Sequence, residues 1–254
     1  MQPELLLTVA DGIMSLTLNR PEAKNAITRA MAIAIAKAID ELDGNPDIGV
    51  AVLSGAGDTF CSGMDLKAFL RGESAIVEGR GFGGLCERPP VKPLIAAVEG
   101  PALAGGLELA ISCDLIVAAD SACFGIPEVR RGLVAGAGGL LRLPRQMPQR
   151  VAMEMALTGE PISAHRAYEL GLVNRIVPTG QALQAAQTIA RSIAANAGLA
   201  VTCSKKVIIE SRDWPNDQMF ARQAPSVRAV FTSDDAREGA AAFAEKRPPK
   251  WRDR

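Results

Sequence analysis

The chain has 254 residues, 48 % of them apolar, and its 28 lysines and arginines balance 28 aspartates and glutamates. That length and apolar share suit one large domain, or one domain with a helical appendage, and exclude a disordered chain. A net charge of zero excludes a general electrostatic field for nucleic acid, so such binding would need a local basic patch.

The N-terminal segment and the apolar runs indicate a protein of the cytoplasm without a membrane segment. Glu4 and Asp11 interrupt the first residues, so we expect no secretory signal. The most apolar stretch, residues 94–119, contains Glu99, Glu108 and Asp114 and is too polar to cross a bilayer.

The cysteines and the single histidine argue against a metal site. The five cysteines are odd in number and never spaced CxxC, which favours free thiols over a disulfide framework or a zinc site. They are Cys61, Cys86, Cys113, Cys123 and Cys203. His165 alone excludes a histidine-rich metal centre, and we expect it on the surface at the start of a short helix.

The first elements are a hairpin and a helix. Residues 5–19 contain two strand-prone runs around Asp11 and Gly12, a typical hairpin turn. Apolar residues then recur at helical spacing over residues 28–42, and Thr28 is placed to cap the start of that helix.

Strand and helix signals alternate in the following part of the chain. A strand over residues 50–54 leads into a glycine-rich loop, and the polar stretch 71–90 is expected to be a mobile loop with some helix. The next predicted elements are strand 94–98, helix 104–112, strand 115–118, helices 151–157 and 164–170, and strand 172–177. This alternation predicts an α/β fold with a parallel sheet.

Beyond residue 179 only helical patterns remain. Four runs have apolar residues at helical spacing, with no strand signal between them: residues 181–195, 201–211, 217–231 and 235–245. We therefore divide the chain into an α/β core with the functional site over residues 1–180 and a helical C-terminal region over residues 181–254. The residues after Lys246 are expected to form an exposed tail.

The first loop that could carry chemistry is residues 60–66. It follows the strand at 50–54 through Gly55 and Gly57 and then enters a helix. Such a loop leaves backbone N–H groups free to bind an anion or an oxyanion. The alternative is an ordinary strand-to-helix turn with Asp65 near the helix cap.

The second loop is residues 100–108. Gly105 and Gly106 let the backbone come close to a ligand at the N-terminus of a helix, and Glu108 returns its carboxylate to that face. The alternative is that Glu108 only stabilises the first helical turn, an effect of about 0.3–1 kcal/mol.

The third loop contains a second acid. Pro127 fixes the chain immediately before Glu128, again after a strand signal. The alternative is a solvated acid paired with Arg130 or Arg131.

Together the two acids suggest a reaction. Glu108 and Glu128 each follow a strand of the predicted sheet, and ligands of open α/β sheets bind outside the carboxyl ends of the strands. In a shared pocket, repulsion and burial would drive their pKa values apart and leave one acid and one base. Free N–H groups of the glycine loops could stabilise negative charge on a carbonyl oxygen. This apparatus can form or quench an enolate.

Motifs along the whole chain resemble those of the crotonase, or enoyl-CoA hydratase/isomerase, family. The matching segments are LNRPEAKNA at 18–26, FCSGMDL at 60–66, KPLIAAVEG at 92–100, GGLEL at 105–109, CD at 113–114, FGIPE at 124–128 and FAEKR at 243–247. The resemblance implies a crotonase-like spiral of ββα units and a helical C-terminal region that builds trimers, often paired into hexamers.

The resemblance also implies roles for single residues. The backbone N–H groups of Met64 and Gly105 would form the oxyanion hole for a thioester carbonyl. Glu108 would orient and deprotonate water, and Glu128 would deliver a proton to the α-carbon. The backbone of Gly136 would help to hold the water.

Coenzyme A would be part of the substrate, so no separate cofactor and no metal is expected. The residues implied to line it are Ala23, Lys24, Ser62, Gly63, Asp65, Leu66 and Lys67. Phe243 and Lys246 would reach the coenzyme A of a neighbouring subunit. One departure from the family pattern is Ala104, where many members have a third glycine.

The function implied is the reversible addition of water across the 2,3-double bond of an enoyl-CoA, giving a 3-hydroxyacyl-CoA. Because both acids are present, hydration is favoured over the action of an enoyl-CoA isomerase. Segments 143–148 and 242–251 look more like the carnitinyl-CoA dehydratase branch, which stays open as an alternative. A non-catalytic acyl-CoA-binding or RNA-binding scaffold is disfavoured by the zero net charge and the intact acid pair.

Overall fold

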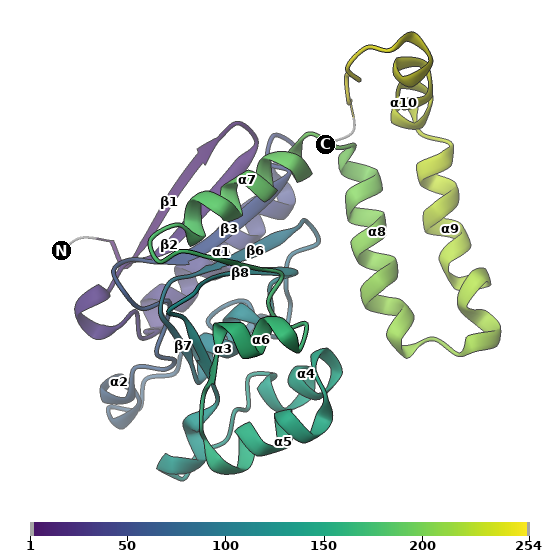
Figure 1. Ribbon diagram of the computed structural model, residues 1–254. Helices are drawn as coiled ribbons and strands as arrows, with labels where there is room; N and C mark the ends of the chain where they lie inside the picture. The colour runs from purple at the N-terminus through teal and green to yellow at the C-terminus, as the bar shows by residue number, and fades with distance from the viewer. Residues whose placement is uncertain (1–2, 253–254) are drawn as a thin grey trace.

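A six-stranded sheet lies at the centre of the molecule (Figure 1). The computed structural model describes residues 3–252. In sheet order the strands are β1 (Leu5–Ala10), β2 (Ile13–Leu18), β3 (Val50–Gly55), β6 (Leu94–Val98), β8 (Leu115–Ala119) and β11 (Arg175–Val177). Strands β1 and β2 form the predicted antiparallel hairpin, and every later pairing in this sheet is parallel. The predicted α/β class with a parallel sheet is confirmed.

Helices cover both faces of this sheet, which explains the almost continuous apolar sequences of its central strands. Helix α1 (Arg29–Gly44) buries Met31, Ile35 and Ile39 in the larger core cluster. Its predicted cap is present, since Thr28 Oγ1 accepts a hydrogen bond from the Met31 N–H at 3.1 Å. Helix α7 (Ala182–Ala194) packs on the opposite face through alanines spaced four residues apart.

A second, three-stranded sheet was not predicted. It consists of β7 (Pro101–Leu103), β9 (Cys123–Gly125) and β10 (Ile162–Ser163), and a bridge between Cys61 and Ala102 extends its pairing to one further loop. Two or three residues are too few to give a strand period in the sequence.

The two sheets give the chain its spiral path. Three times it passes from the large sheet through the small sheet into a short helix: from β3 past Cys61 to α2 (Leu66–Leu70), from β6 through β7 to α3 (Gly105–Ala110), and from β8 through β9 to the 3₁₀ helix η2 (Pro127–Arg131). This is the ββα spiral that the resemblance implied.

Shorter helices complete the core. They are η1 (Pro21–Ala23), α4 (Gly139–Gln146), α5 (Gln149–Thr158) and α6 (Ala164–Glu169). Helices α5 and α6 match the predicted helices, whereas α4 was not predicted.

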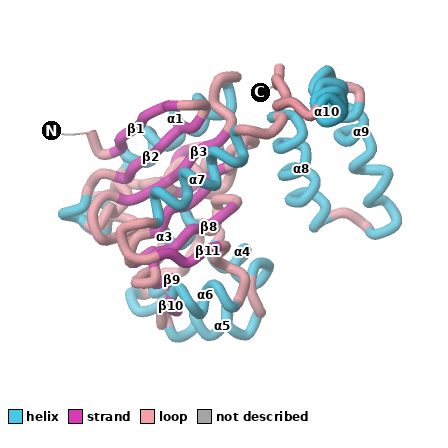
Figure 2. Tube along the Cα trace, turned by 45° about the horizontal axis from the view of Figure 1, so that its top comes forward, coloured by secondary structure: helices cyan, strands magenta, loops and turns pink. Residues whose placement is uncertain are grey.

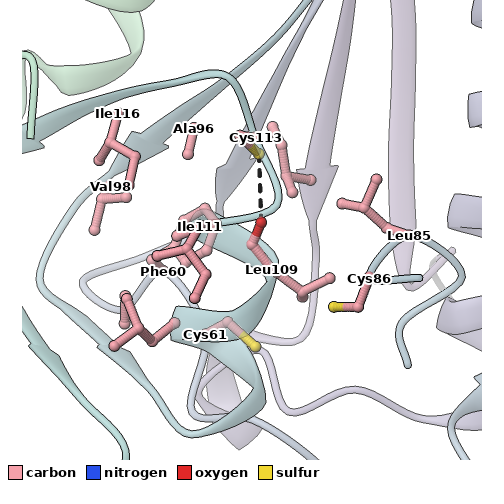
Figure 3. Close-up of a cluster of buried hydrophobic side chains, with 14 of the residues drawn as sticks. Phe60, Cys61, Leu85, Cys86, Ala96, Val98, Leu109, Ile111, Cys113 and Ile116 are labelled. Carbon is pink, nitrogen blue, oxygen red and sulfur yellow. Dashed lines mark hydrogen bonds between the residues drawn. The ribbon is translucent and has the colours of Figure 1, made fainter. Parts of the chain in front are cut away.

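The stretch 71–90 differs from the expected mobile loop with some helix. It forms a small ribbon of β4 (Ile76–Val77) and β5 (Gly81–Phe82), has no helix, and buries residues 80–86. Leu85 and Cys86 lie beside α3 in the main core (Figure 3). Its glycines serve close packing: a Cβ on Gly84 would lie 2.2 Å from the Ala32 carbonyl oxygen.

The four predicted C-terminal helices are present, but they do not form one unit. Helix α7 belongs by its packing to the sheet, whereas α8 (Gly198–Glu210) and α9 (Met219–Phe231) form a pair that projects away from it (Figures 1 and 2). Short 3₁₀ turns, η3 (Ser211–Asp213) and η4 (Asn216–Gln218), join this pair, and α10 (Asp234–Glu245) follows. By packing, the core therefore extends to the end of α7 and not only to residue 180.

The segment after Lys246 folds back instead of forming a free tail. Arg247 forms an ion pair with Glu238, and the Trp251 indole N–H donates to the Ala195 carbonyl at 2.8 Å. The last two residues lie outside the described range. Within residues 3–252, no helix is long and apolar enough to cross a membrane.

Candidate active site

Two free backbone donors lie on neighbouring loops. The Leu103 N–H donates to the Cys61 carbonyl at 2.9 Å, which joins the loop of Met64 to the loop that enters α3. The contact is tight, because a Cβ on Gly63 would lie 3.0 Å from the backbone nitrogen of Gly105. Among the described residues, neither the Met64 N–H nor the Gly105 N–H donates a hydrogen bond. The structure thus leaves both donors available to a ligand.

The start of α3 explains why the Gly105 donor is free. The first N–H of a helix has no partner inside the helix. Ala104 precedes it with φ 53° and ψ −132°, a conformation that favours glycine, and its N–H is bonded to the Gly125 carbonyl at 2.8 Å. A Cβ on Gly105 would lie 2.4 Å from the Phe82 ring. Close packing therefore requires glycine at position 105.

Glu108 is buried and held by a turn from another part of the chain. Its Oε1 accepts hydrogen bonds from the N–H groups of Ala137 at 2.7 Å and Gly139 at 2.9 Å. Burial raises the pKa of Glu108, while these two bonds and the charge of Arg142 oppose the rise. The carboxylate is directed at this turn, so Glu108 does more than stabilise its own helix.

Glu128 has no comparable support. It stands on η2, and its Oε2 is buried without a hydrogen-bond partner among the described residues. Burial and then the charge of Glu108 raise its pKa to about 7, although its own backbone N–H and Arg131 act in the opposite direction. The suggested pair with Arg130 does not form, because Arg130 pairs with Glu160.

The two carboxyl groups act on each other electrostatically. They are close enough for the charge of Glu108 to raise the pKa of Glu128. Burial raises the pKa of both acids, but Glu108 Oε1 receives two hydrogen bonds that oppose the rise, whereas Glu128 Oε2 has no partner among the described residues. The surroundings of the two carboxyl groups therefore differ.

The role expected of Gly136 is restricted by the turn. Its N–H donates to the Val134 carbonyl at 2.8 Å, so only its carbonyl remains free to contact a water. The N–H groups of this turn that bind Glu108 are those of Ala137 and Gly139, which were not predicted from the sequence. The glycine run 136–139 was the available signal.

Two of the segments expected to line coenzyme A, residues 23–24 and residues 62–63, lie next to each other. The Ser62 N–H donates to the Lys24 carbonyl at 3.0 Å, next to Ala23 at the end of η1. Leu66 and Lys67 are exposed on α2, one turn after the Met64 donor. Lys24 is exposed as well, whereas Ala23 and Ser62 are half-buried and Gly63 is buried.

Asp65 has a structural role. Its Oδ1 accepts hydrogen bonds from Lys67 N–H at 3.0 Å and Ala68 N–H at 3.1 Å, which caps α2, and its Oδ2 lies 3.0 Å from Arg20 Nη1. The cap foreseen as the alternative is present, and this carboxylate is already fully engaged.

Phe243 and Lys246 are not brought to this site within the chain. Phe243 belongs to α10 and Lys246 caps its end, and α10 lies at the far end of the molecule from α2 (Figure 1). Phe243 is 88 % exposed. Their contact with a neighbouring subunit's ligand stays a prediction.

His165 and Cys61 lie in places that do not favour a catalytic role. His165 is exposed on α6, as predicted. Cys61 is fully buried and its thiol donates to the Asn25 carbonyl, and burial raises its pKa to about 12. A thiol with that pKa is not a nucleophile at neutral pH.

Comparison with known proteins gives the same family throughout. The family model described as enoyl-CoA hydratase/isomerase matches residues 8–254. An enoyl-CoA hydratase of Mycobacterium tuberculosis is 40 % identical and is aligned over 99 % of this chain and 97 % of its own. A carnitinyl-CoA dehydratase of Salmonella arizonae is also 40 % identical, with 99 % of each chain covered.

Solved structures agree with these relatives. The crystal structure of an enoyl-CoA hydratase from Mycobacterium tuberculosis has a TM-score of 0.98 and 57 % identity, covering 100 % of both chains. That of a carnitinyl-CoA hydratase from Mycobacterium avium has a TM-score of 0.80 and 41 % identity, again over both full chains. The chain therefore belongs to the enoyl-CoA hydratase/isomerase family, and the family resemblance of its motifs is confirmed.

Proposed function

We propose that this protein is an enoyl-CoA hydratase, which adds water reversibly across the 2,3-double bond of an enoyl-CoA to give a 3-hydroxyacyl-CoA. The observation that carries the proposal is the combination of two acids with raised pKa values, the buried Glu108 and the half-buried Glu128, with two backbone donors that have no partner among the described residues. Relatives named enoyl-CoA hydratase at 40–57 % identity support it.

The donors would act on the thioester carbonyl. When hydroxide adds to the β-carbon, negative charge develops on the carbonyl oxygen, and the Met64 and Gly105 N–H groups would stabilise it. Removal of one such donor typically costs about 2.7–4 kcal/mol of transition-state stabilisation. Because no acceptor among residues 3–252 is bonded to these N–H groups, they need no rearrangement to receive the oxygen.

The acids would divide the proton transfers. Glu108, held as a carboxylate by two N–H donors, takes a proton from water while the oxygen of that water bonds to the β-carbon. Glu128, with a pKa of about 7, gives its proton to the α-carbon as the enolate collapses. The pair carries one proton before and after the reaction, so the same residues serve dehydration in reverse.

The proposal extends to the cofactors, the cellular location and the oligomeric state of the enzyme. The coenzyme A moiety belongs to the substrate, and no metal or redox cofactor takes part. We place the enzyme in the cytoplasm, in keeping with its five free cysteines. We also propose a homotrimer, or a hexamer formed by two trimers, which would cover large apolar side chains exposed on the projecting helices. These are Ile208, Ile209, Phe220 and Phe231.

A carnitinyl-CoA dehydratase is the second candidate. One relative with that name is 40 % identical to the chain, as is one of the two hydratases named above, whereas the other hydratase is 57 % identical. Both reactions move water across the same bond of a thioester and would use the same acids. Only the acyl group distinguishes them.

The test is hydration of crotonyl-CoA, followed as loss of absorbance of the conjugated thioester. Glu108→Gln and Glu128→Gln should each reduce turnover roughly 10²–10⁴-fold while the proteins stay folded and still bind acyl-CoA. Glu154→Gln, a change on the exposed face of α5, serves as the matched control and should leave turnover unaltered. Normal hydration by either acid variant would refute the assignment. A preference for crotonobetainyl-CoA across an acyl panel would favour the second candidate.

A further inference from the structure

Arg142 of α4 connects two segments that surround the buried base. Its Nη2 donates to the Cys86 carbonyl at 2.6 Å, and its Nη1 donates to the Ala137 carbonyl at 3.5 Å. The first partner belongs to the buried part of segment 71–90 and the second to the turn that holds Glu108. One guanidinium therefore ties the turn to the core.

The contact with the turn is close. A Cβ on Gly138 would lie 2.1 Å from Arg142 Nη1, so the guanidinium covers this glycine directly. Gly138 has φ +111° and stands between the two residues whose N–H groups hold Glu108. Movement of the guanidinium would thus move both donors.

The charge of Arg142 is not neutralised by an ion pair. Among the described residues, no carboxylate lies within ion-pair distance of it, whereas its neighbour Arg145 pairs with Asp213. Its hydrogen bonds go to backbone carbonyls. Its positive charge therefore remains available to act on Glu108 through the turn.

We propose that Arg142 is a positioning residue, which fixes the turn 137–139 against segment 71–90 and so holds the Glu108 carboxylate in its productive place. The inference rests on the proposed role of Glu108 as the base. It assigns to Arg142 two effects, the geometry of the two donors and a favourable charge, and these can be separated by substitution.

The charged groups that face Glu108 are few. Arg142 from α4 stabilises its ionised form, and Glu128 from η2 is the acid on whose pKa the charge of Glu108 acts. Cys86 from segment 71–90 also faces it, but burial raises the pKa of that thiol to about 12, so it stays neutral. Loss of Arg142 should therefore raise the pKa of Glu108.

The experiment compares Arg142→Met and Arg142→Lys with Arg145→Met, an exposed arginine of the same helix. Urea unfolding of each variant first establishes that it is folded. The pKa of Glu108 is then measured by ¹³C-carboxyl NMR, with the signal assigned by its loss in Glu108→Gln. This readout needs no turnover, so it is independent of whether the protein is a hydratase.

We expect Arg142→Met to raise the pKa of Glu108 by about one unit and Arg145→Met to leave it unchanged. With crotonyl-CoA, Arg142→Met should lower kcat on the order of 10- to 100-fold, with KM altered less than about twofold. Lysine keeps the positive charge but cannot bond both carbonyls as the planar guanidinium does. Arg142→Lys should therefore keep the pKa of Glu108 near its wild-type value, while its kcat should stay below that of the wild type.

Two outcomes would overturn the proposal. One is an unchanged pKa of Glu108 in folded Arg142→Met, which would leave the arginine a merely structural role. The other is an equal effect of Arg145→Met, which would reduce the result to a general charge effect. If the wild-type protein fails to hydrate crotonyl-CoA, the proposed function is refuted. The pKa of Glu108 measured by NMR would then still test the positioning role of Arg142.

Discussion

Glu108 on α3 and Glu128 on η2 occupy equivalent places in successive turns of the spiral, yet the surroundings of the two carboxyl groups differ. Burial raises the pKa of both groups. Glu108 regains stabilisation from two backbone N–H donors, whereas Glu128 leaves one buried oxygen without a partner. The comparison teaches that two neighbouring acids can differ through hydrogen-bond compensation and not through burial alone, which is the basis on which we propose Glu108 as the base.

The strongest test of this division is the double variant Glu108→Gln/Glu128→Gln. Each single change should cost roughly 10²–10⁴-fold in kcat/KM for crotonyl-CoA. Each catalytic cycle of water addition needs both proton transfers. The kcat/KM of the double variant should therefore fall about as far as that of the worse single variant. Losses that multiply would mean that the two acids act independently.

The pH dependence tests the same pair. With the pKa of Glu128 raised to about 7, the pair loses its remaining proton above neutrality, and kcat/KM should fall about tenfold per pH unit there. Dehydration of 3-hydroxybutyryl-CoA should follow the same curve, because the equilibrium constant of the reaction does not depend on pH. A flat profile from pH 7 to 9 in either direction would contradict the assignment of Glu128.

The unsupported oxygen of Glu128 should also cost stability. Its carboxyl is protonated in both states below pH 4.5, and the folded state then loses stability as pH rises toward 7, since the unfolded chain ionises first. Relative to wild type, Glu128→Gln should therefore gain about 1.5 kcal/mol of unfolding free energy between pH 5 and pH 8, a value reduced for solvent screening.

Urea unfolding at the two pH values, at one protein concentration, measures that gain. Glu154→Gln is the exposed control and should show no such dependence. An equal stability difference at both pH values would show that the Glu128 carboxyl is not strained by its surroundings.

The smallest expected effect concerns the donor side of the site. Ala104 has φ 53°, so Ala104→Gly should relieve strain and stabilise the fold by about 1 kcal/mol, or roughly 2–4 °C in Tm. Ala30→Gly, on the exposed side of α1, should have the opposite sign, because glycine weakens an ordinary helix. A drop in Tm for Ala104→Gly would mean that contacts of its methyl group outweigh the strain.

Much of the fold was predictable because its signals are local. The hairpin at Asp11 and Gly12, the Thr28 cap and the apolar central strands each follow from a short stretch of sequence. The stretch 71–90 was misjudged for the opposite reason. Its glycines indicate a flexible loop when taken alone, but Gly83 and Gly84 pack against α3 and α1, which lie elsewhere in the sequence.

The site was predictable in its residue types and not in its connections. Glu108, Glu128 and the glycine loops stand out because a core does not favour acids beside flexible backbone. The hydrogen bonds from Ala137 and Gly139 to Glu108 join residues 29 and 31 positions apart. The hydrogen bond from the Gly136 N–H to the Val134 carbonyl depends on the backbone conformation of the turn. A glycine in a segment with several glycines does not predict that conformation.

Residue order alone therefore specified the elements and the chemical groups, since caps, apolar periods and glycine turns act over a few neighbouring positions. Folding in three dimensions decided which groups meet. Short strands of the second sheet align Cys61, Ala102 and Phe124 side by side, and this alignment brings the two donor loops together and places the loop of Glu128 beside them. Pairings between distant segments are set by packing and hydrogen bonding of the whole chain, and no local pattern encodes them.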